Sequence, residues 1–459
     1  MPTLILLSAA TQSLEGMRRG GLDLSLAQRA TGLLGLATIL FLAWLLSYDR
    51  RRVPWRLVGM GILLQAGFGL LVLKSTPGRW LFERVGNVFQ GLLTFSREGA
   101  RFIFGNLVND TVPVGVPGAA DALDTTAGYV AQTTSSFAFF VLPTIIFFSA
   151  LMTVLYYLGI MQLVVKGIAW LMQRTLRTSG AETLSASGNI FIGQTEAPLL
   201  IKPFVEKLTQ SELFTVMTGG FATVAGGVFA AYVAMLQGFF PDIAGHLMAA
   251  SVMNAPAGLL LSKIIRPETE TPVSRDATHV VVEKTDANVV EAAAGGAATG
   301  VQLALNVGGM LMAFIALIAL VNFFIGWAGG LVGLEGLNLQ TIFGTLLRPL
   351  AWVMGVPWGE TGYVGGLIGL KVVLTEFVAY ARFGADVTAG AVSLSPRSLV
   401  ITAYALLGFA NFASIGIQIG GIGGLAPSRR SDLARFGIRA MIAGNLAAFM
   451  SATLAGMIL

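Results

Sequence analysis

The chain has 459 residues, of which 55% are hydrophobic and only 12% charged, and its mean hydropathy is +0.76. Soluble domains carry about 25% charged residues, so this composition excludes a water-covered globule and indicates a protein that has lipid as its solvent. The absence of cysteine, the two histidines and the net charge of +5 exclude disulfides, thiolate or multi-histidine metal sites and a strongly basic nucleic-acid surface.

Apolar runs long enough to cross a bilayer recur along the chain. Residues 1–30 contain only a short apolar run, so we expect an interfacial or loosely ordered extension and not a cleaved signal peptide. A spanning helix needs about 20 mostly apolar residues. On this criterion the sequence predicts eight spans, at 31–47, 57–74, 136–160, 213–237, 243–265, 301–329, 397–419 and 434–457.

Other segments mix apolar and basic positions. At 80–107 and 161–177 this mixture is typical of helices that lie at the membrane interface. Arginine and lysine also follow the first, third and fifth predicted spans and separate the last two. We expect a bacterial inner-membrane protein, and the positive-inside rule makes these loops cytoplasmic and so places both termini in the periplasm.

Two apolar segments are interrupted by a carboxylate and by small or helix-breaking residues. They read TLSASGNIFIGQTEAPLLIKPFVE at 183–206 and WGETGYVGGLIGLKVVLTEFVAYARFGADVT at 358–388. Irregular backbone at membrane depth is tolerated only where it is buried in protein or lines a cavity. We therefore predict two re-entrant helical hairpins, the first entering from the cytoplasm and the second from the periplasm.

Each predicted hairpin is followed by a span with a polar, glycine-rich middle and then by an ordinary span. These middles are TGGFATVAGG at 218–227 and GFANFASIGIQIGG at 408–421. The chain thus reads as two copies of one unit in opposite orientation, at about 160–265 and 340–459. Inverted repeats with interrupted helices indicate a secondary transporter and place its binding site at the interruptions.

Each predicted hairpin carries an acid, Glu196 in the first and Glu376 in the second. A carboxylate at the bilayer centre costs about 2.5–3.5 kcal/mol, so it must face protein, water or a ligand. Two simpler interpretations stay open, in which Glu196 pairs with Lys202 and Glu376 pairs with Arg382. Because oppositely directed hairpins can meet at mid-membrane, we favour a shared role in binding.

Polar residues in the second glycine-rich middle suit a polar solute with an aromatic ring. Asn411 and Ser414 are three residues apart and share a helical face, with Phe409 close by. The alternative is hydrogen bonding between helices, which such residues commonly provide in membranes.

A second group offers oxygen ligands. Asn189, Thr223 and the backbone near Ile192 and Val224 could gather the amide, hydroxyl and carbonyl oxygens that hard cations prefer. Asn189 could equally cap a half-helix. The sequence contains no nucleophile elbow, zinc motif or P-loop lysine, so we do not expect an enzyme.

Several of these segments resemble the concentrative nucleoside transporters. The similarity is carried by GQTEAPLLIKPFVEKLTQSELFTVMTGGFATVAGG at 193–227, TEFVAY at 375–380, GFANFASIGIQIGGIGGLAPSRRSDLAR at 408–435 and LPTIIFFSALMTVLYYLGIMQ at 142–162. It extends from about residue 31 to the end. The resemblance implies a homotrimer of all-α, eight-span protomers with two re-entrant hairpins.

The resemblance also implies a trimerising scaffold domain and a transport domain that moves across the membrane like an elevator. The expected domains are an N-terminal extension at 1–30, scaffold spans at 31–160, the first transport repeat at 161–265, a cytoplasmic loop with a scaffold span at 266–335, and the second transport repeat at 336–459.

The family's binding residues can be carried over motif by motif. The implied substrate-binding set is Gln194, Thr195, Glu196 and Val228 for the nucleobase, and Glu376, Phe409, Asn411 and Ser414 for the ribose. The implied sodium set is Asn189, Ile192, Thr223 and Val224. The chain departs from the family at Thr375, where Asn is usual, and at Thr223, where Ser is common. Proton-coupled members tend to lose the residue equivalent to Asn189, so its presence favours sodium.

The expected function is therefore sodium-coupled symport of a uridine-like nucleoside, with sodium as the coupling ion and no other cofactor. One charge that crosses about 100 mV supplies about 2.3 kcal/mol, which supports roughly 50-fold accumulation. Proton-coupled symport is the alternative in the same class. A passive channel with Glu196 and Glu376 as selectivity groups is the alternative in another class.

Overall fold

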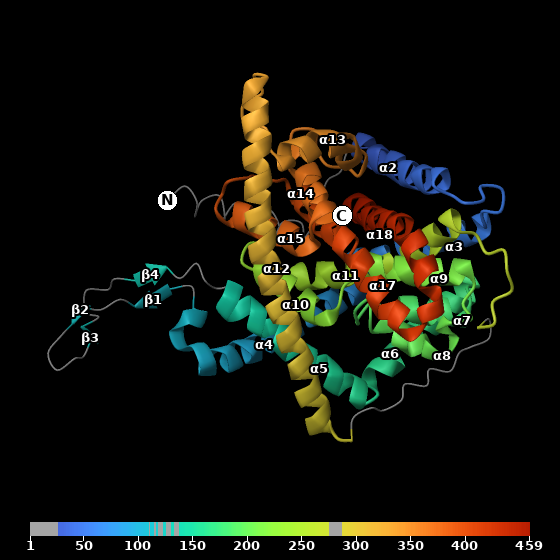
Figure 1. Cartoon of the computed structure of the whole chain (residues 1–459), viewed down its shortest axis with the longest axis horizontal. Coiled ribbons are helices and arrows are strands. Elements are labelled where there is room, and N and C mark those ends of the chain that lie inside the picture. Colours follow the sequence, from blue (N-terminus) through green and yellow to red (C-terminus); the bar gives the residue numbers. More distant parts are fainter. Residues whose placement is uncertain are drawn as a thin grey trace.

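The computed structural model describes residues 26–109, 111–113, 116–117, 123–124, 130–132, 137–274 and 287–459 (Figure 1). The predicted extension at 1–30 lies mostly outside these residues. The described part is almost entirely helical, as the sequence predicts. Its only strands form two short antiparallel pairs, β1 (Thr111–Pro113) with β4 (Val130–Gln132) and β2 (Val116–Pro117) with β3 (Leu123–Asp124).

Seven stretches of the described residues are long and apolar enough to cross a membrane. They contain α2 (Leu26–Leu45), α3 (Trp55–Lys74), α5 (Leu142–Tyr157) with its π-helical start η3 (Phe137–Val141), α9 (Gln210–Ala222) with α10 (Gly226–Leu236), α11 (Ile243–Ile265), α12 (Val289–Leu331) and α18 (Arg430–Ile458). This confirms a multi-pass membrane protein.

The predicted spans at 213–237 and 397–419 are each two shorter helices. The first is α9 and α10, and the second is α16 (Pro396–Leu406) and α17 (Phe412–Leu425). The second break follows from Gly408, whose φ of +105° ends a right-handed helix. The break falls at the start of the glycine-rich middle, 408–421, at which the sequence predicts an interruption.

Helices also form at both segments predicted to lie at the interface. These are α4 (Thr76–Phe104), followed by the 3₁₀ turn η1 (Gly105–Val108), and α6 (Ile160–Leu176). A further amphipathic helix, α13 (Leu339–Val353), was not predicted, because Arg348 and Pro349 interrupt its apolar pattern.

Two sets of elements follow one another in the same order. The first set is α6, α7 (Gly180–Gly188), η4 (Ala197–Ile201), α8 (Lys202–Val205), α9, α10 and α11. The second is α13, α14 (Thr361–Val373), α15 (Glu376–Thr388), α16, α17, the turn η5 (Pro427–Arg429) and α18. We call α7 through α8 hairpin 1 and α14 with α15 hairpin 2. The order matches the repeated unit read from the sequence.

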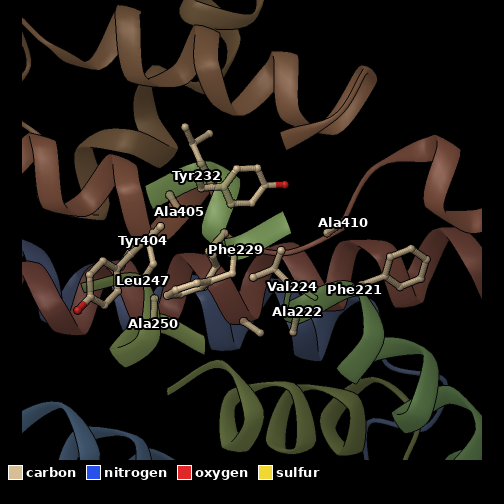
Figure 2. Close-up of a cluster of buried hydrophobic side chains, with 14 of the residues drawn as sticks. Phe221, Ala222, Val224, Phe229, Tyr232, Leu247, Ala250, Tyr404, Ala405 and Ala410 are labelled. Atoms are coloured by element: carbon tan, nitrogen blue, oxygen red, sulfur yellow. The ribbon is translucent and has the colours of Figure 1, made fainter. Parts of the chain in front are cut away.

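The two repeats share one core. α18 packs against α9, α11 and α16, and the buried side chains of these helices belong to one hydrophobic cluster. Figure 2 shows Phe221 and Val224 of the first repeat in one cluster with Tyr404 and Ala410 of the second. The repeats therefore form a single interlocked body.

The remaining long helices form two groups, which differ in the helices that they contact. α2 packs against α18 and α3 against α11, so both adjoin the repeats. α5 and α12 instead pack along each other, and α12 crosses the front of the molecule in Figure 1. α5 also contacts α10, which joins this pair to the first repeat.

A buried charge cluster fixes the base of hairpin 1. Ser179 and Glu182 form a capping box at the start of α7, and Thr209 and Glu212 form another at the start of α9. Ser179 Oγ donates to Glu212 at 2.6 Å, and Lys263 Nζ lies 2.7 Å from Glu182. These bonds tie α7, α9 and α11 together, so the tip of hairpin 1 is held from its base.

Candidate binding site

A cavity of about 170 Å³ lies where the tips of both hairpins and both helix breaks meet α12. It brings together every residue of the predicted substrate-binding set. Its lining includes Gln194, Thr195, Glu196, Val228, Glu376, Phe409, Asn411 and Ser414. Residues more than 200 positions apart in the chain thus form one site.

Glu376 is the anchored acid of the cavity. It begins α15, and only 4% of it is exposed. Its Oε2 accepts from Asn411 Nδ2 at 2.7 Å and its Oε1 accepts from the Tyr232 hydroxyl at 2.9 Å. Asn411 Oδ1 accepts from the backbone N–H of Ser414 at 2.9 Å, so the orientation of the Asn411 amide is fixed. The carboxylate therefore enters the cavity with a set direction.

The contacts of Arg382 exclude the simpler interpretation, in which Glu376 pairs with this arginine. Arg382 pairs with Asp386, with 2.7 Å between Nε and Oδ2, and not with Glu376. Thr375 is the N-cap of α15, and its hydroxyl accepts from the N–H of Val378 at 3.3 Å. Thr375, which departs from the family pattern, therefore caps the start of α15.

A chain of side-chain amides orients another wall of the cavity. Gln418 on α17 is fully buried, and its Nε2 donates to the Met217 carbonyl at 3.1 Å and to Gln194 Oε1 at 3.0 Å. A main-chain carbonyl can only accept, so this contact fixes Gln418. Gln194 must then turn its own Nε2 to Ser414 Oγ, 3.2 Å away. A Cβ at Gly220 would lie 2.9 Å from both glutamines, so the contact needs glycine there.

Glu196 differs from Glu376 in being exposed. In the described part of the chain no ion pair joins it to Lys202, so that interpretation is not supported. A Cβ at Gly193 would lie 2.0 Å from Glu196 Oε2, so the carboxylate folds over the backbone at this glycine. Glu196 therefore lines the cavity as an exposed acid.

The wall contributed by α12 is entirely apolar. Leu303, Val307, Met310 and Leu311 form it, and the polar lining groups come from the hairpins and broken helices. The cavity therefore has one polar side and one apolar side.

The predicted sodium residues lie beside the first helix break. Asn189 is 1% exposed, and neither Nδ2 nor Oδ1 of its amide has a hydrogen-bond partner. A Cβ at Gly219 would lie 3.5 Å from Asn189 Nδ2, and Thr223 donates its hydroxyl to the Gly219 carbonyl. Asn189 and Thr223 thus adjoin the same turn of α9, with Val224 next in the chain and Ile192 three residues after Asn189.

A buried amide without partners costs about 1–3 kcal/mol. An unpaired amide oxygen beside a hydroxyl and the open carbonyls of a broken helix fits a hard cation such as Na⁺. As cargo, the ion would offset that cost. The residues present therefore fit the expected ion.

Sequence reasoning missed two groups of lining and supporting residues. Gln418 lies four positions after Ser414, so a helical-face argument on α17 could have found it. Tyr232 lies four positions after Val228 on α10, but the sequence around it does not distinguish it from an aromatic core residue. The α12 residues gave no signal, because that helix is apolar on all sides.

Broken helices in two interlocked repeats around a half-polar cavity define a secondary membrane transporter. Family profiles match most of the chain. They are "Na+ dependent nucleoside transporter N-terminus" at 34–107, "Nucleoside recognition" at 138–239 and "Na+ dependent nucleoside transporter C-terminus" at 246–456. The protein belongs to this family, the concentrative nucleoside transporters, and is a transporter rather than an enzyme.

Relatives agree with this assignment. The uncharacterized transporter YutK of Bacillus subtilis is 46% identical over 93% of this chain and 98% of its own length. Sodium/nucleoside cotransporter 1 of Rattus norvegicus is 42% identical over 95% of this chain and 65% of its own length.

Solved structures agree as well. CNTnw in an inward-facing substrate-bound state is 44% identical, with a TM-score of 0.81 over 94% of this chain and 97% of that one. An outward-facing CNTnw variant is 43% identical, with a TM-score of 0.84 over 94% and 97%.

Proposed function

We propose that the protein carries nucleosides into the cell together with sodium. The single observation that carries this proposal is the convergence of both hairpins on one cavity, with the unpartnered Asn189 amide beside the first helix break. Sodium-dependent nucleoside transport is also what the family profiles describe. The proposal places the substrate in the cavity and the ion at Asn189.

The polar side of the cavity suits the two halves of a nucleoside. The Glu376 carboxylate can accept from neighbouring sugar hydroxyls, because each of its oxygens keeps a lone pair beyond its bond to Tyr232 or Asn411. Gln194 and Ser414 offer N–H and O–H groups to the carbonyl edge of a base. Phe409 offers an aromatic face for stacking. A uridine-like molecule uses all of these contacts.

Sodium would act on the tip of hairpin 1. Residues 189–196, between α7 and η4, leave the helix and carry both Asn189 and Gln194. A cation held by Asn189 and the carbonyls near Ile192 would order this segment and so position Gln194 for the base. Each ligand then binds a site that the other has prepared, which is positive coupling.

The apolar wall of α12 supports an elevator-type movement. Because α12 lines the cavity only with apolar side chains, the hairpins can slide past it without breaking a hydrogen bond to that wall. We propose that the hairpins, broken helices, α11 and α18 move together, and that α5 and α12 form part of a fixed scaffold. The helices α2 and α3, expected in the scaffold, pack on α18 and α11 and so adjoin the moving unit.

We further propose a homotrimer in a bacterial inner membrane with both termini in the periplasm. The exposed aromatic side chains Phe323, Phe324 and Trp327 on α12 suit a lipid or subunit contact. Cross-linking in native membranes would give the subunit number, and terminal tags tested with a protease would give the orientation.

Uptake of radiolabelled uridine by proteoliposomes tests the function directly. An inward sodium gradient is expected to drive uridine above its equilibrium level, and replacement of sodium by choline is expected to stop this. Accumulation driven by a pH gradient alone would mean proton coupling instead. Flux that never exceeds equilibrium would mean a passive channel.

A further inference from the structure

A fully buried lysine stands at the second helix break. Lys371, near the end of α14, has no exposed surface. Its Nζ donates to the carbonyl of Ala405 at 2.9 Å and to that of Leu407 at 3.1 Å, and it lies 5.8 Å from the centre of the Phe449 ring. A buried ammonium is costly unless it is paired, so its position requires an explanation.

The acceptors of Lys371 belong to the end of a helix. Ala405 lies in the last turn of α16, and Leu407 is its C-cap. The last carbonyls of a helix have no partner within the helix and form the negative end of its dipole. The break between α16 and α17 therefore creates a place for a positive charge, and the ammonium of Lys371 fills it.

The first repeat has the same arrangement without a lysine. Thr223 is the C-cap of α9 as Leu407 is the C-cap of α16, and both are in an extended conformation. Asn189 caps the end of α7, and Lys371 lies in the last turn of α14, the corresponding helix of hairpin 2. The same hairpin helix thus faces the same helix break in each repeat, with a neutral unpartnered amide in one and an ammonium in the other.

We propose that Lys371 is a tethered cation, which occupies in the second repeat the place that a sodium ion takes in the first. This inference rests on the proposed sodium coupling. Its consequence is that the transporter exchanges a cation with solution at one helix break only, because the other is permanently filled by its own side chain.

The tethered charge also serves the substrate site. Lys371 lies in the last turn of α14 and Glu376 in the first turn of α15, so the two charges flank the tip of hairpin 2. The ammonium travels with this acid wherever the hairpin goes, so Glu376 is never moved through the bilayer as an unbalanced charge. Lys371 is thus a positioning residue for Glu376, without touching the substrate.

The test compares two variants of the purified full-length protein in detergent without nucleoside. Lys371→Ala removes the ammonium and leaves a space, whereas Lys371→Met removes the charge and fills most of the space. Unfolding midpoints are measured in choline, sodium and methylammonium chloride. We expect both variants to lose stability in choline, and only Lys371→Ala to regain most of that loss in methylammonium. We also expect its sodium dependence to become steeper, with a Hill coefficient above that of the wild type.

Stability loss in Lys371→Ala but not in Lys371→Met, with no recovery of Lys371→Ala by either cation, would show that the lysine only fills space. Lys371→Gln, which keeps N–H donors but no charge, covers the case in which the alanine variant does not fold. Wild-type stability and uridine affinity in Lys371→Gln would overturn the proposal. Lys207→Ala, at an exposed lysine, is the control for loss of one charge.

The sodium response of the wild type separates this inference from the proposed function. A wild type that sodium does not stabilise would contradict sodium coupling, while recovery of Lys371→Ala by methylammonium would still support a tethered cation.

Discussion

Glu376 is buried and accepts two hydrogen bonds. The role of its charge can be tested by replacing one carboxylate oxygen with an amide nitrogen. Glu376→Gln keeps the shape and replaces a carboxylate that accepts from Tyr232 and Asn411 and that we propose accepts from the sugar. Each hydrogen bond to a charged group contributes about 1.5–3 kcal/mol. We expect uridine uptake to fall at least about 100-fold, since 1.4 kcal/mol is about tenfold.

Initial uptake rates in proteoliposomes with an inward sodium gradient and in proteoliposomes without sodium measure this effect. Glu335→Gln, at an exposed acid outside the cavity, is the control and should transport as the wild type does. Uptake by Glu376→Gln within a few-fold of the control would contradict a sugar-binding role for this acid.

Gln418 is expected to act only through Gln194. Gln418→Leu removes the bond that holds the Gln194 amide, so Gln194 can rotate away from the base. Without this hydrogen bond the binding free energy of uridine should weaken by about 1–1.5 kcal/mol. The KM for uridine should then rise about tenfold, with a smaller effect on the maximal rate. Gln65→Leu is a matched control, because Gln65 is also buried and bonds to Ser451 away from the cavity. An equal change in the KM of Gln418→Leu and Gln65→Leu would contradict the role of Gln418 in orienting Gln194.

Among single residues, the sequence was informative for polar side chains that lie within an otherwise apolar segment. Glu196, Glu376 and Asn411 were found because polar groups are expensive inside a bilayer. Tyr232 was missed because an aromatic in an apolar helix has the same pattern as a core residue. Its hydroxyl becomes informative only when the fold brings Glu376 to it.

The two broken helices cross at their breaks. The N–H of Phe409 donates to the Thr223 carbonyl at 3.2 Å, which joins the second break to the first. Gly408, with φ of +105°, permits this approach, since a Cβ there would lie 2.7 Å from the Phe221 carbonyl oxygen. The crossing therefore depends on one glycine between two backbones.

Gly408→Ala should push the two breaks apart. Strain of this kind costs about 1–3 kcal/mol, so the unfolding midpoint and the uridine affinity should both fall. Gly416→Ala on α17 is the matched control, because a Cβ there meets no atom within 4 Å. Differential scanning fluorimetry and uridine binding measure the two effects. A Gly408→Ala protein as stable as the control would mean that the crossing can relax.

Element order was largely predictable, because long apolar runs and capping signals are local properties of the sequence. The interruptions within the two spans were predicted from their glycine-rich middles, but the residues at which α16 ends and α17 begins were not. Their positions depend on Gly408, where the chain passes close to the Phe221 carbonyl, and this is a contact between distant segments. α13 was missed for a local reason, because Arg348 and Pro349 interrupt its apolar pattern.

Across the whole molecule, one movable boundary is expected between α12 and α17. Met310 on α12 and Ile417 on α17 both line the cavity. A Met310→Cys, Ile417→Cys pair joined by a short dithiol-reactive cross-linker should stop uptake, because it ties the moving unit to the scaffold. The chain has no cysteine of its own, so the pair reacts alone.

A second pair within the scaffold serves as the control. A Cβ at Gly308 on α12 would lie 3.2 Å from Leu142 on α5, so Gly308→Cys with Leu142→Cys links two helices that are expected to stay together. This pair should transport after cross-linking. Continued uptake with the Met310 and Ile417 positions joined would argue against sliding at this boundary.

The chemistry of the cavity lining has a metabolic consequence. Among the described residues that line it are two acids, Glu196 and Glu376, but no arginine or lysine. A phosphorylated nucleoside would bring about two negative charges to these acids and to the apolar wall of α12, with no cation to receive them. Nucleotides should therefore be refused from either side, and a kinase that phosphorylates the imported molecule would trap it in the cytoplasm.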